Sequence, residues 1–344
     1  MTKLRAPDVF TRHNLGVLLR HPRVVGRLLR NYARVLGGNR RVLRGVEFCL
    51  TYQCQLDCAH CLTKPLIDAG RVEMTSDQAV RAIGDLADLG AVFINITGGE
   101  PLVRDDLFDV LERAARNRSV LITLASNALV LDDKVARRLR DVGVAMVTMS
   151  LDGPDAATHN AARGDAGAFD ALLRACAAVK AAGLDLWLTT ILTRENAADG
   201  SIFRTADLAR RLGATLTVNF AYAVGNWRDH EAGIGEVEER VFRELLARPN
   251  VRWEGSSNYL RQGCPAGSEK LYITPYGDVM PCATIHRSFG NLLTEPVRDI
   301  WARMGTVDWF RGANKSCLVA QDKRFIEKEM PIIQKDPGRP WGDT

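Results

Sequence analysis

The sequence predicts an α/β fold: a partial (β/α)6 barrel with a small C-terminal β-hairpin and helix module and an N-terminal amphipathic helix. From residue 45 to about residue 222, short apolar segments alternate with helical ones, as in parallel βαβ units. Beyond residue 225 this alternation stops, and "LYITPYGDVMPC" has the pattern of two short strands joined by a turn. Before residue 45, apolar residues recur at helical spacing among many arginines.

The barrel is expected to contain six parallel strands joined by helices, with its functional loops after the strands' carboxyl ends. Apolar runs place strands at 45–52, 91–97, 119–126, 144–153, 184–193 and 214–222, and helical patterns at 75–90, 104–117, 132–143, 168–183 and 201–213. The predicted units are an N-terminal extension (1–44), the barrel (45–230), the second module (231–330) and a tail (331–344), which is ordered only if it packs on the body.

Composition and charge limit the classes of function. The 344 residues are 46% hydrophobic and 25% charged and contain no long uncharged apolar run, so no membrane-spanning helix is expected. The N-terminus lacks a secretory signal, so the expected location is the cytoplasm, where clustered cysteines indicate metal binding or catalysis more often than disulfides. Residues 1–45 hold eleven of the 46 basic and one of the 41 acidic residues, so the remainder carries a net charge of −5. That acidic body argues against a nucleic-acid partner.

The basic extension contains one predicted helix, "HPRVVGRLLRNYARVLGG", with Pro22 near its start and a glycine pair at its end. The simplest interpretation is a helix packed on the body with its arginines in water. Contact with anionic membrane lipid, or with a substrate or partner, stays open. Its apolar stripe consists of Val24, Val25, Leu28, Leu29, Tyr32, Val35 and Leu36.

Three of the eight cysteines, Cys54, Cys58 and Cys61, lie within eight positions directly after the first predicted strand. Buried thiols, a zinc site or a disulfide are alternatives, but structural zinc needs a fourth ligand, and His60 lies directly beside Cys61. An iron–sulfur cluster held by three thiolates fits better, because it leaves one iron open to a small-molecule ligand.

The C-x3-C-x2-C spacing after a first strand resembles the radical S-adenosylmethionine (SAM) superfamily. A second resemblance is "TGGEP", where Gly98, Gly99, Glu100 and Pro101 follow the second predicted strand. Two glycines permit close backbone approach, and a carboxylate can pair with an ammonium group. In the superfamily this loop binds the amino group of SAM.

The ends of the later strands also resemble the superfamily's SAM-binding segments. By that resemblance, Ser126 and Asn127 lie near the SAM carboxylate, Ser150 and Asp152 lie near the ribose, and Arg163 anchors the loop or substrate. Weaker candidates are Thr190 and Thr193 after the fifth strand. The resemblance implies a [4Fe–4S] cluster that reductively cleaves SAM to a 5′-deoxyadenosyl radical, with the protein holding SAM and substrate in register and excluding water.

A second cysteine set, Cys264, Cys282 and Cys317, resembles the auxiliary-cluster modules called SPASM and twitch. The spacing C-x12-G-x4-C places Gly277 in the expected hairpin turn, but the further cysteines of a full SPASM module are absent. The resemblance therefore implies one auxiliary [4Fe–4S] cluster, with an open iron or with another ligand such as His286.

Two cysteines remain outside these sets. Cys176 lies within an alanine-rich helical segment and is expected in the core. Cys49 lies on the first strand, where core packing is the simpler interpretation and a hydrogen-donor role the catalytic one. Substrate contacts are expected around Asn219, Tyr222 and Asn226.

The leading functional hypothesis is a radical SAM oxidoreductase that dehydrogenates a small natural product or a sugar- or aminocyclitol-like substrate. The alternatives are a maturase of a ribosomally made peptide, an epimerase or decarboxylase, and a lipid-modifying enzyme that contacts a membrane peripherally. A non-catalytic iron–sulfur or zinc protein would need no SAM-binding loop. Flavodoxin or ferredoxin is the expected reductant, with no nucleic-acid partner.

Overall fold

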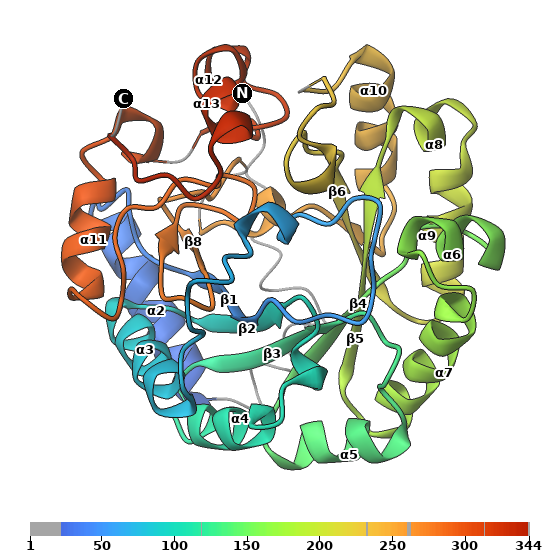
Figure 1. Ribbon diagram of the computed structural model, residues 1–344, viewed down its shortest axis with the longest axis horizontal. Coiled ribbons are helices and arrows are strands. Elements are labelled where there is room, and N and C mark those ends of the chain that lie inside the picture. The colour runs from blue at the N-terminus through green and yellow to red at the C-terminus, as the bar shows by residue number, and fades with distance from the viewer. Residues whose placement is uncertain (1–21, 118, 232, 260–262, 313, 343–344) are drawn as a thin grey trace.

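The protein is built around one curved sheet of nine strands, in the order β7-β6-β5-β4-β3-β2-β1-β8-β9 (Figure 1). The computed structural model describes residues 22–117, 119–231, 233–259, 263–312 and 314–342. All neighbouring strands are parallel except β8 and β9, which are antiparallel.

Strands β1 to β6 form the predicted partial barrel, and helices cover its outer face (Figure 1). The strands are β1 (Gly45–Thr51), β2 (Phe93–Gly98), β3 (Leu121–Ser126), β4 (Met146–Ser150), β5 (Asp185–Leu192) and β6 (Thr215–Phe220). The helices that the sequence predicted between them are α3 (Ser76–Leu89), α4 (Leu107–Ala115), α5 (Asp133–Asp141), α7 (Ala168–Ala181) and α9 (Ser201–Arg211). Two further helices, α6 (Ala156–Arg163) and α8 (Arg194–Ala198), lie in segments where the sequence predicted no helix.

Strands β2, β4, β5 and β6 bury alternate side chains, which separates a helix-facing layer from a cavity-facing one. Along β5, Leu186 and Leu188 are buried, whereas Trp187 and Thr189 between them are half-buried and line an internal cavity. This period-two pattern is what a strand between a helix layer and a cavity requires. The barrel interior therefore holds a cavity lined by both apolar and polar side chains, instead of being filled with packed hydrocarbon.

The C-terminal hairpin is present, but it continues the barrel sheet instead of forming a sheet of its own. β8 (Lys270–Ile273) pairs in parallel with β1, and β9 (Val279–Met280) pairs with β8 across a turn in which Gly277 has a φ of +88°. Pairing with β8 satisfies backbone groups that would otherwise be exposed along the β1 edge. At the opposite edge, β7 (Val251–Arg252) pairs with β6.

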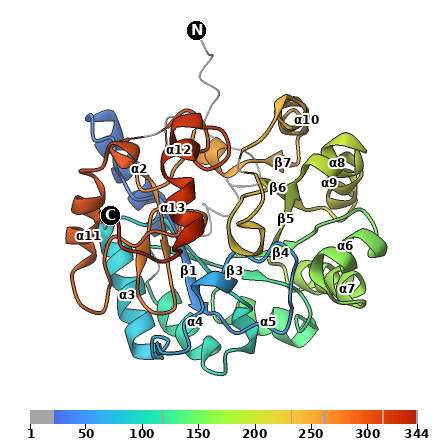
Figure 2. The ribbon, with the colours of Figure 1, turned by 45° about the horizontal axis from the view of Figure 1, so that its top comes forward.

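Helices after the barrel lie at both ends of the sheet. α10 (Glu236–Leu246) lies on the β6 side, and α11 (Val297–Met304), α12 (Lys323–Lys328) and α13 (Met330–Lys335) lie on the β1 side (Figure 2). The tail packs on the hairpin module as far as residue 342. Trp341 stacks on Phe289 with ring centroids 5.1 Å apart, and the Gly338 N–H donates to the His286 carbonyl oxygen at 2.8 Å.

The N-terminal helix α2 (Pro22–Leu36) covers the amino ends of the barrel strands. Val24 and Leu28 are buried there, and the amide of Asn31 donates to the Gly90 carbonyl oxygen at 2.9 Å and to the Tyr259 hydroxyl at 2.7 Å. The predicted apolar stripe is wider than the surface that α2 buries against the barrel, since Leu29 and Leu36 are 60% and 74% exposed.

Residues 1–21 of the predicted extension lie outside the described residues. Within the described part of the chain, no helix is both long enough and apolar enough to span a bilayer.

Candidate active site

One cavity of about 670 Å³ occupies the barrel interior and brings most of the predicted site residues together. Leu28 of α2 forms part of its floor, and the cysteine loop (residues 52–63) forms part of its opposite wall. The loop cysteines (Cys54, Cys58 and Cys61) all line it. The other predicted residues in its wall are Gly98, Gly99, Ser126, Asn127, Ser150, Asp152, Arg163, Thr190 and Asn219.

The loop cysteines are free thiols with donors aimed at their sulfur atoms. The Asn127 amide donates to Cys54 Sγ at 3.8 Å, and the Arg163 guanidinium donates to Cys58 Sγ at 3.7 Å. Such donors stabilise thiolates, which are the ligands of iron–sulfur clusters. In the described part of the chain, no three His, Cys, Asp or Glu side chains meet closely enough to hold a single metal ion. The donor set, the free thiols and the adjoining cavity fit a cluster.

The cysteine loop is braced by the segment that follows β6. The Asn226 side chain donates to the Cys58 carbonyl oxygen at 2.8 Å, and its backbone N–H donates to the Cys61 carbonyl oxygen at 2.9 Å. Gly225 has a φ of +66°, and a Cβ there would lie 2.1 Å from the Cys61 oxygen. Asn226, expected to contact substrate, therefore holds the loop in place.

The two glycines after β2 allow that strand's end to approach the start of the cysteine loop. A Cβ on Gly98 would lie 2.3 Å from the Thr51 carbonyl oxygen, and one on Gly99 would lie 2.4 Å from the Gln53 carbonyl oxygen. Instead the Gly99 N–H donates to Thr51 at 2.8 Å and the Glu100 N–H donates to Gln53 at 2.8 Å. Only glycine permits this backbone contact.

Glu100 is fully buried beside the cavity and accepts hydrogen bonds from two backbone groups. The Asn127 N–H donates to it at 2.6 Å and the Leu102 N–H at 3.1 Å. Burial raises the pKa of Glu100 to about 7, although these hydrogen bonds oppose the shift. A cation arriving beside this carboxylate would favour its ionised form. Pro101 is buried in the first turn after it.

The turn after β3 has an unusual backbone. Ala128 is a non-glycine residue with a positive φ, +74°, and its N–H donates to the Ser126 hydroxyl at 3.0 Å. Residues other than glycine rarely adopt a positive φ, and such strained backbone positions occur often at functional sites. The turn keeps Ser126 and Asn127 in the cavity wall.

Asp152 and Arg163 form a buried ion pair in the cavity wall. Asp152 Oδ2 contacts the Arg163 guanidinium and lies 3.6 Å from His60 Nε2. Despite burial, Arg163 and then His60 lower the pKa of Asp152, while burial lowers the pKa of His159 to about 4. The backbone N–H of Asp152 donates to His159 Nδ1 at 3.1 Å, which ties the turn after β4 to α6.

Cys49 and Thr193, two further candidates, make contacts that stabilise the fold. Cys49 is fully buried among tyrosines, donates to the Thr51 carbonyl oxygen at 3.4 Å and is absent from the described wall of the cavity. Burial raises the pKa of its thiol strongly. Thr193 caps α8 by accepting from the Asn196 N–H at 3.2 Å. Cys176 lies in the core, as expected.

The module cysteines (Cys264, Cys282 and Cys317) lie within electrostatic reach of one another beside the hairpin. The thiol of Cys317 donates to the sulfur of Cys264, which raises the pKa of Cys317 and lowers that of Cys264. Burial raises the pKa of Cys282 to about 11. Tyr222, also expected to contact substrate, lies within electrostatic reach of all three thiols.

His286, considered as a fourth ligand, has another partner. Its Nε2 lies 2.8 Å from the Ala283 carbonyl oxygen, to which it donates, and burial lowers the pKa of the ring to about 4.

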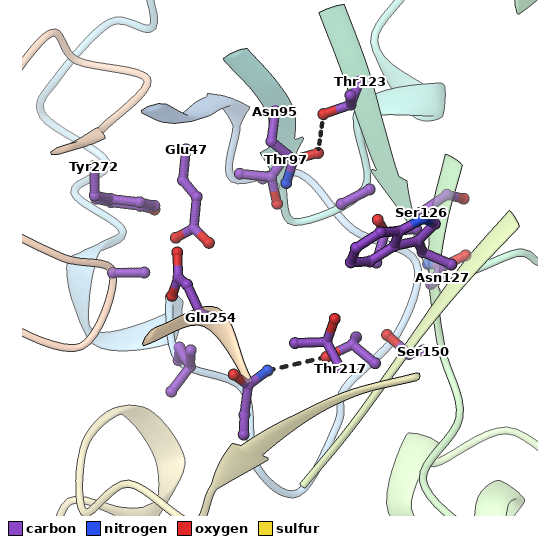
Figure 3. Close-up of a pocket in the computed structure, with 18 of the residues that line it drawn as sticks. Glu47, Asn95, Thr97, Thr123, Ser126, Asn127, Ser150, Thr217, Glu254 and Tyr272 are labelled. Atoms are coloured by element: carbon purple, nitrogen blue, oxygen red, sulfur yellow. Dashed lines mark hydrogen bonds between the residues drawn. The ribbon is translucent and has the colours of Figure 1, made fainter. Parts of the chain in front are cut away.

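Four residues in the same cavity wall were missed from the sequence: Glu47, Glu254, Lys270 and Tyr272. Lys270 Nζ lies 2.9 Å from Glu47 Oε1 and 2.7 Å from Glu254 Oε1. The only sequence indication is a glutamate inside the otherwise apolar first strand. Figure 3 shows Glu47, Glu254 and Tyr272 at one end of the cavity, opposite Ser126, Asn127 and Ser150.

Comparisons with known proteins agree with this geometry. Residues 48–206 match the model of the radical SAM superfamily, and residues 264–323 match SPASM, an iron–sulfur cluster-binding domain. The chain is 31% identical over 273 residues to a mycofactocin maturase, MftC, of Mycobacterium tuberculosis, covering 73% of this chain and 68% of the relative.

Other relatives differ in their reactions. An AdoMet-dependent heme synthase of Methanosarcina barkeri is 27% identical over 73% of this chain and 80% of its own. A PqqA peptide cyclase of Granulibacter bethesdensis is 26% identical over 81% of this chain and 79% of its own. Among solved structures, SuiB of Streptococcus suis bound to precursor peptide SuiA superposes with a TM-score of 0.62 at 17% identity, over 79% of this chain and 68% of that one.

Radical SAM enzymes use SAM and a [4Fe–4S] cluster, and a SPASM domain binds auxiliary iron–sulfur clusters. The sequence resemblances to both are confirmed. The chain belongs to the radical SAM superfamily and carries a C-terminal SPASM domain.

Proposed function

We propose that this radical SAM enzyme oxidatively modifies a ribosomally made peptide. The observation that carries the proposal is a single cavity whose wall contains the cysteine loop, the two-glycine turn and a charged group beside the module cysteines. The peptide class is supported by the likeness to a mycofactocin maturase and a PqqA peptide cyclase, and to the fold of SuiB, solved with its precursor peptide.

The loop cysteines would hold the SAM-binding cluster, which supplies the electron for reductive cleavage of SAM when both are bound. Glu100 would pair with the amino group of SAM, and the turn after β3 would orient its carboxylate. Ser150, Asp152, Arg163 and Thr190 would position the rest of the molecule, since all four line the cavity. Leu28 of α2 lines the floor of the cavity and would limit the entry of water there.

The module cysteines would hold an auxiliary cluster, and Lys270 of the cavity wall lies within electrostatic reach of one of them, Cys282. When bound, that cluster would supply an electron acceptor for a dehydrogenation, which removes a hydrogen atom, an electron and a proton from the substrate. Asn219 lines the cavity and Tyr222 lies within electrostatic reach of all three module thiols, so the end of β6 is near both sites.

The comparisons favour a peptide over the sugar-like substrate that the short module first suggested. A second candidate is a tetrapyrrole, because the heme synthase relatives cover as much of the chain as the maturases do. Flavodoxin or ferredoxin remains the proposed source of electrons, and membrane contact through α2 remains a prediction.

The test begins with anaerobic reconstitution of the iron–sulfur clusters and addition of SAM and a reductant. Short peptides encoded beside the gene would then be supplied and examined by mass spectrometry. We expect a mass loss of two hydrogen atoms, or a cross-link of equal mass change, with one deoxyadenosine per product. Deoxyadenosine formation that no such peptide alters, together with heme formation from a porphyrin precursor, would overturn the peptide assignment.

A further inference from the structure

The end of the cavity farthest from the SAM-binding turns carries a charged group that the mechanism above does not use. We infer that Glu47, held by Lys270 and flanked by Tyr272, recognises a cationic nitrogen group of the substrate, an ammonium or a guanidinium. The inference rests on the proposed function, because it names the chemistry of the substrate that enters the same cavity.

The donors of Lys270 are already committed to protein carboxylates. Its side chain is 5% exposed, and its Nζ contacts Glu47 Oε1 at 2.9 Å and Glu254 at 2.7 Å and 2.8 Å. An ammonium has three N–H donors, so none remains for a substrate carboxylate. A negatively charged group would also meet two carboxylates at close range.

Glu47 keeps an acceptor that faces the cavity. Its Oε1 contacts Lys270, and its Oε2 has no hydrogen-bond donor among the described residues. Burial raises the pKa of Glu47 while Lys270 opposes that shift, so a second cation would further stabilise the ionised carboxylate. Figure 3 shows the carboxyl group of Glu47 directed toward that of Glu254 at the cavity edge.

The buried hydroxyl of Tyr272 is a second, independent indication of a ligand site beside Glu47. It pairs with Glu47 in the β1–β8 register and is 2% exposed. Its hydroxyl has no well-aligned hydrogen bond within the described part of the chain, and only weak contacts to Cys49 and Tyr52 lie beside it. Buried hydroxyls are normally satisfied, so this one is available to a ligand.

The other cations in the cavity wall already have carboxylate partners. Lys64 contacts Asp57, Arg163 contacts Asp152, and Arg44 lies 3.5 Å from Glu269. The wall therefore offers an approaching anion no uncommitted cation among its described residues, whereas it offers a cation the free oxygen of Glu47.

The test uses full-length, anaerobically reconstituted protein and three probes of equal chain length: n-pentylamine, 1-pentanol and pentanoate. Ligand-observed NMR titrations would measure their dissociation constants. We expect pentylamine to bind about tenfold more tightly than pentanol, and pentanoate to bind worst. Glu47→Gln should remove the preference for the amine without weakening pentanol binding. The matched control, Thr148→Val, changes another residue of the cavity wall and should keep the preference.

Tyr272→Phe removes only a hydroxyl and should weaken amine binding several-fold, which covers the case in which Glu47→Gln does not fold. Preferred binding of pentanoate, an amine preference that both variants retain, or no amine binding would overturn the inference. Deoxyadenosine formation is measured in parallel. If the protein fails to cleave SAM but binds the amine through Glu47, the proposed function fails and the subsite stands.

Discussion

At the residue scale, the site depends on a few buried polar groups whose partners are fixed by the fold. Arg163 links three of them, because one guanidinium contacts the Cys58 sulfur and the Asp152 carboxylate, which in turn faces His60. Buried ionic groups of this kind set the local potential strongly, since little water screens them.

Replacing Arg163 by Met should lower the reduction potential of the SAM-binding cluster. The substitution removes a positive charge beside a cluster thiolate and leaves Asp152 negative, so adding an electron becomes less favourable. EPR-monitored redox titration of the reconstituted protein measures the effect. Arg116→Met is the control, because Arg116 pairs with Glu112 at the exposed end of α4 and is absent from the described cavity wall. An equal shift in both variants would contradict a specific role for Arg163.

Glu100 should make the stability of the apoprotein depend on pH. Its pKa is about 7 in the folded protein and ordinarily near 4.5, so between these values the folded state binds more protons than the unfolded state. The free energy of unfolding should therefore fall as pH rises from about 4.5 to 7. Urea unfolding of wild type and Glu100→Gln at pH 5 and pH 7.5 isolates this contribution. The wild type should lose stability relative to the variant at the higher pH, and a constant difference would refute the prediction.

At the element scale, strand ends and their loops determine the site more than the strands do. The cysteine loop is fixed by backbone contacts to the end of β2 and to the segment after β6. Glycines at these contacts allow two backbones to approach where any side chain would intervene. The same glycines therefore affect both the stability of these strand ends and the geometry of the site.

Gly98→Ala should destabilise the protein by roughly 1–3 kcal/mol and weaken SAM binding, because a Cβ would lie 2.3 Å from the Thr51 carbonyl oxygen. Gly84→Ala is the matched control. Gly84 lies inside α3 with nothing within 4 Å of an added Cβ, so this change should stabilise the protein by about 0.5–1 kcal/mol. Urea unfolding and equilibrium SAM binding would report both effects. Equal responses of the two variants would show that the turn does not need its glycine.

At the scale of the whole molecule, the sheet connects the two cysteine sites. β8 follows Cys264 along the chain, pairs with β1 and supplies Lys270 and Tyr272 to the barrel cavity. The module is therefore part of the cavity wall, and changes in it are expected to reach the substrate site.

Replacing all three module cysteines by Ser should leave SAM cleavage measurable but abolish oxidised product, because the substrate radical then lacks its electron acceptor. Iron counting should show the loss of the auxiliary cluster alone. Cys176→Ser is the control, since Cys176 lies in the core of α7 and should keep full iron content. Undiminished product from the triple variant would rule out an auxiliary role.

The sequence by itself determined the alternation of strands and helices, the two cysteine groups and the SAM-binding turns. Local patterns encode these features: period-two burial, helix caps, glycine pairs and cysteine spacing. The predicted strands therefore agree with β1 to β6 within a few residues.

Only the tertiary structure decided what lies between the two cysteine groups. That Glu47, Glu254 and Lys270 meet depends on β8 pairing with β1, a contact between residues more than 200 positions apart. The hydrogen bond from Asn226 to the cysteine loop likewise joins residues that are far apart in the sequence. Such contacts form when the unpaired backbone edge of one strand pairs with a strand that is distant in the sequence. Local sequence patterns do not predict which distant strand that will be.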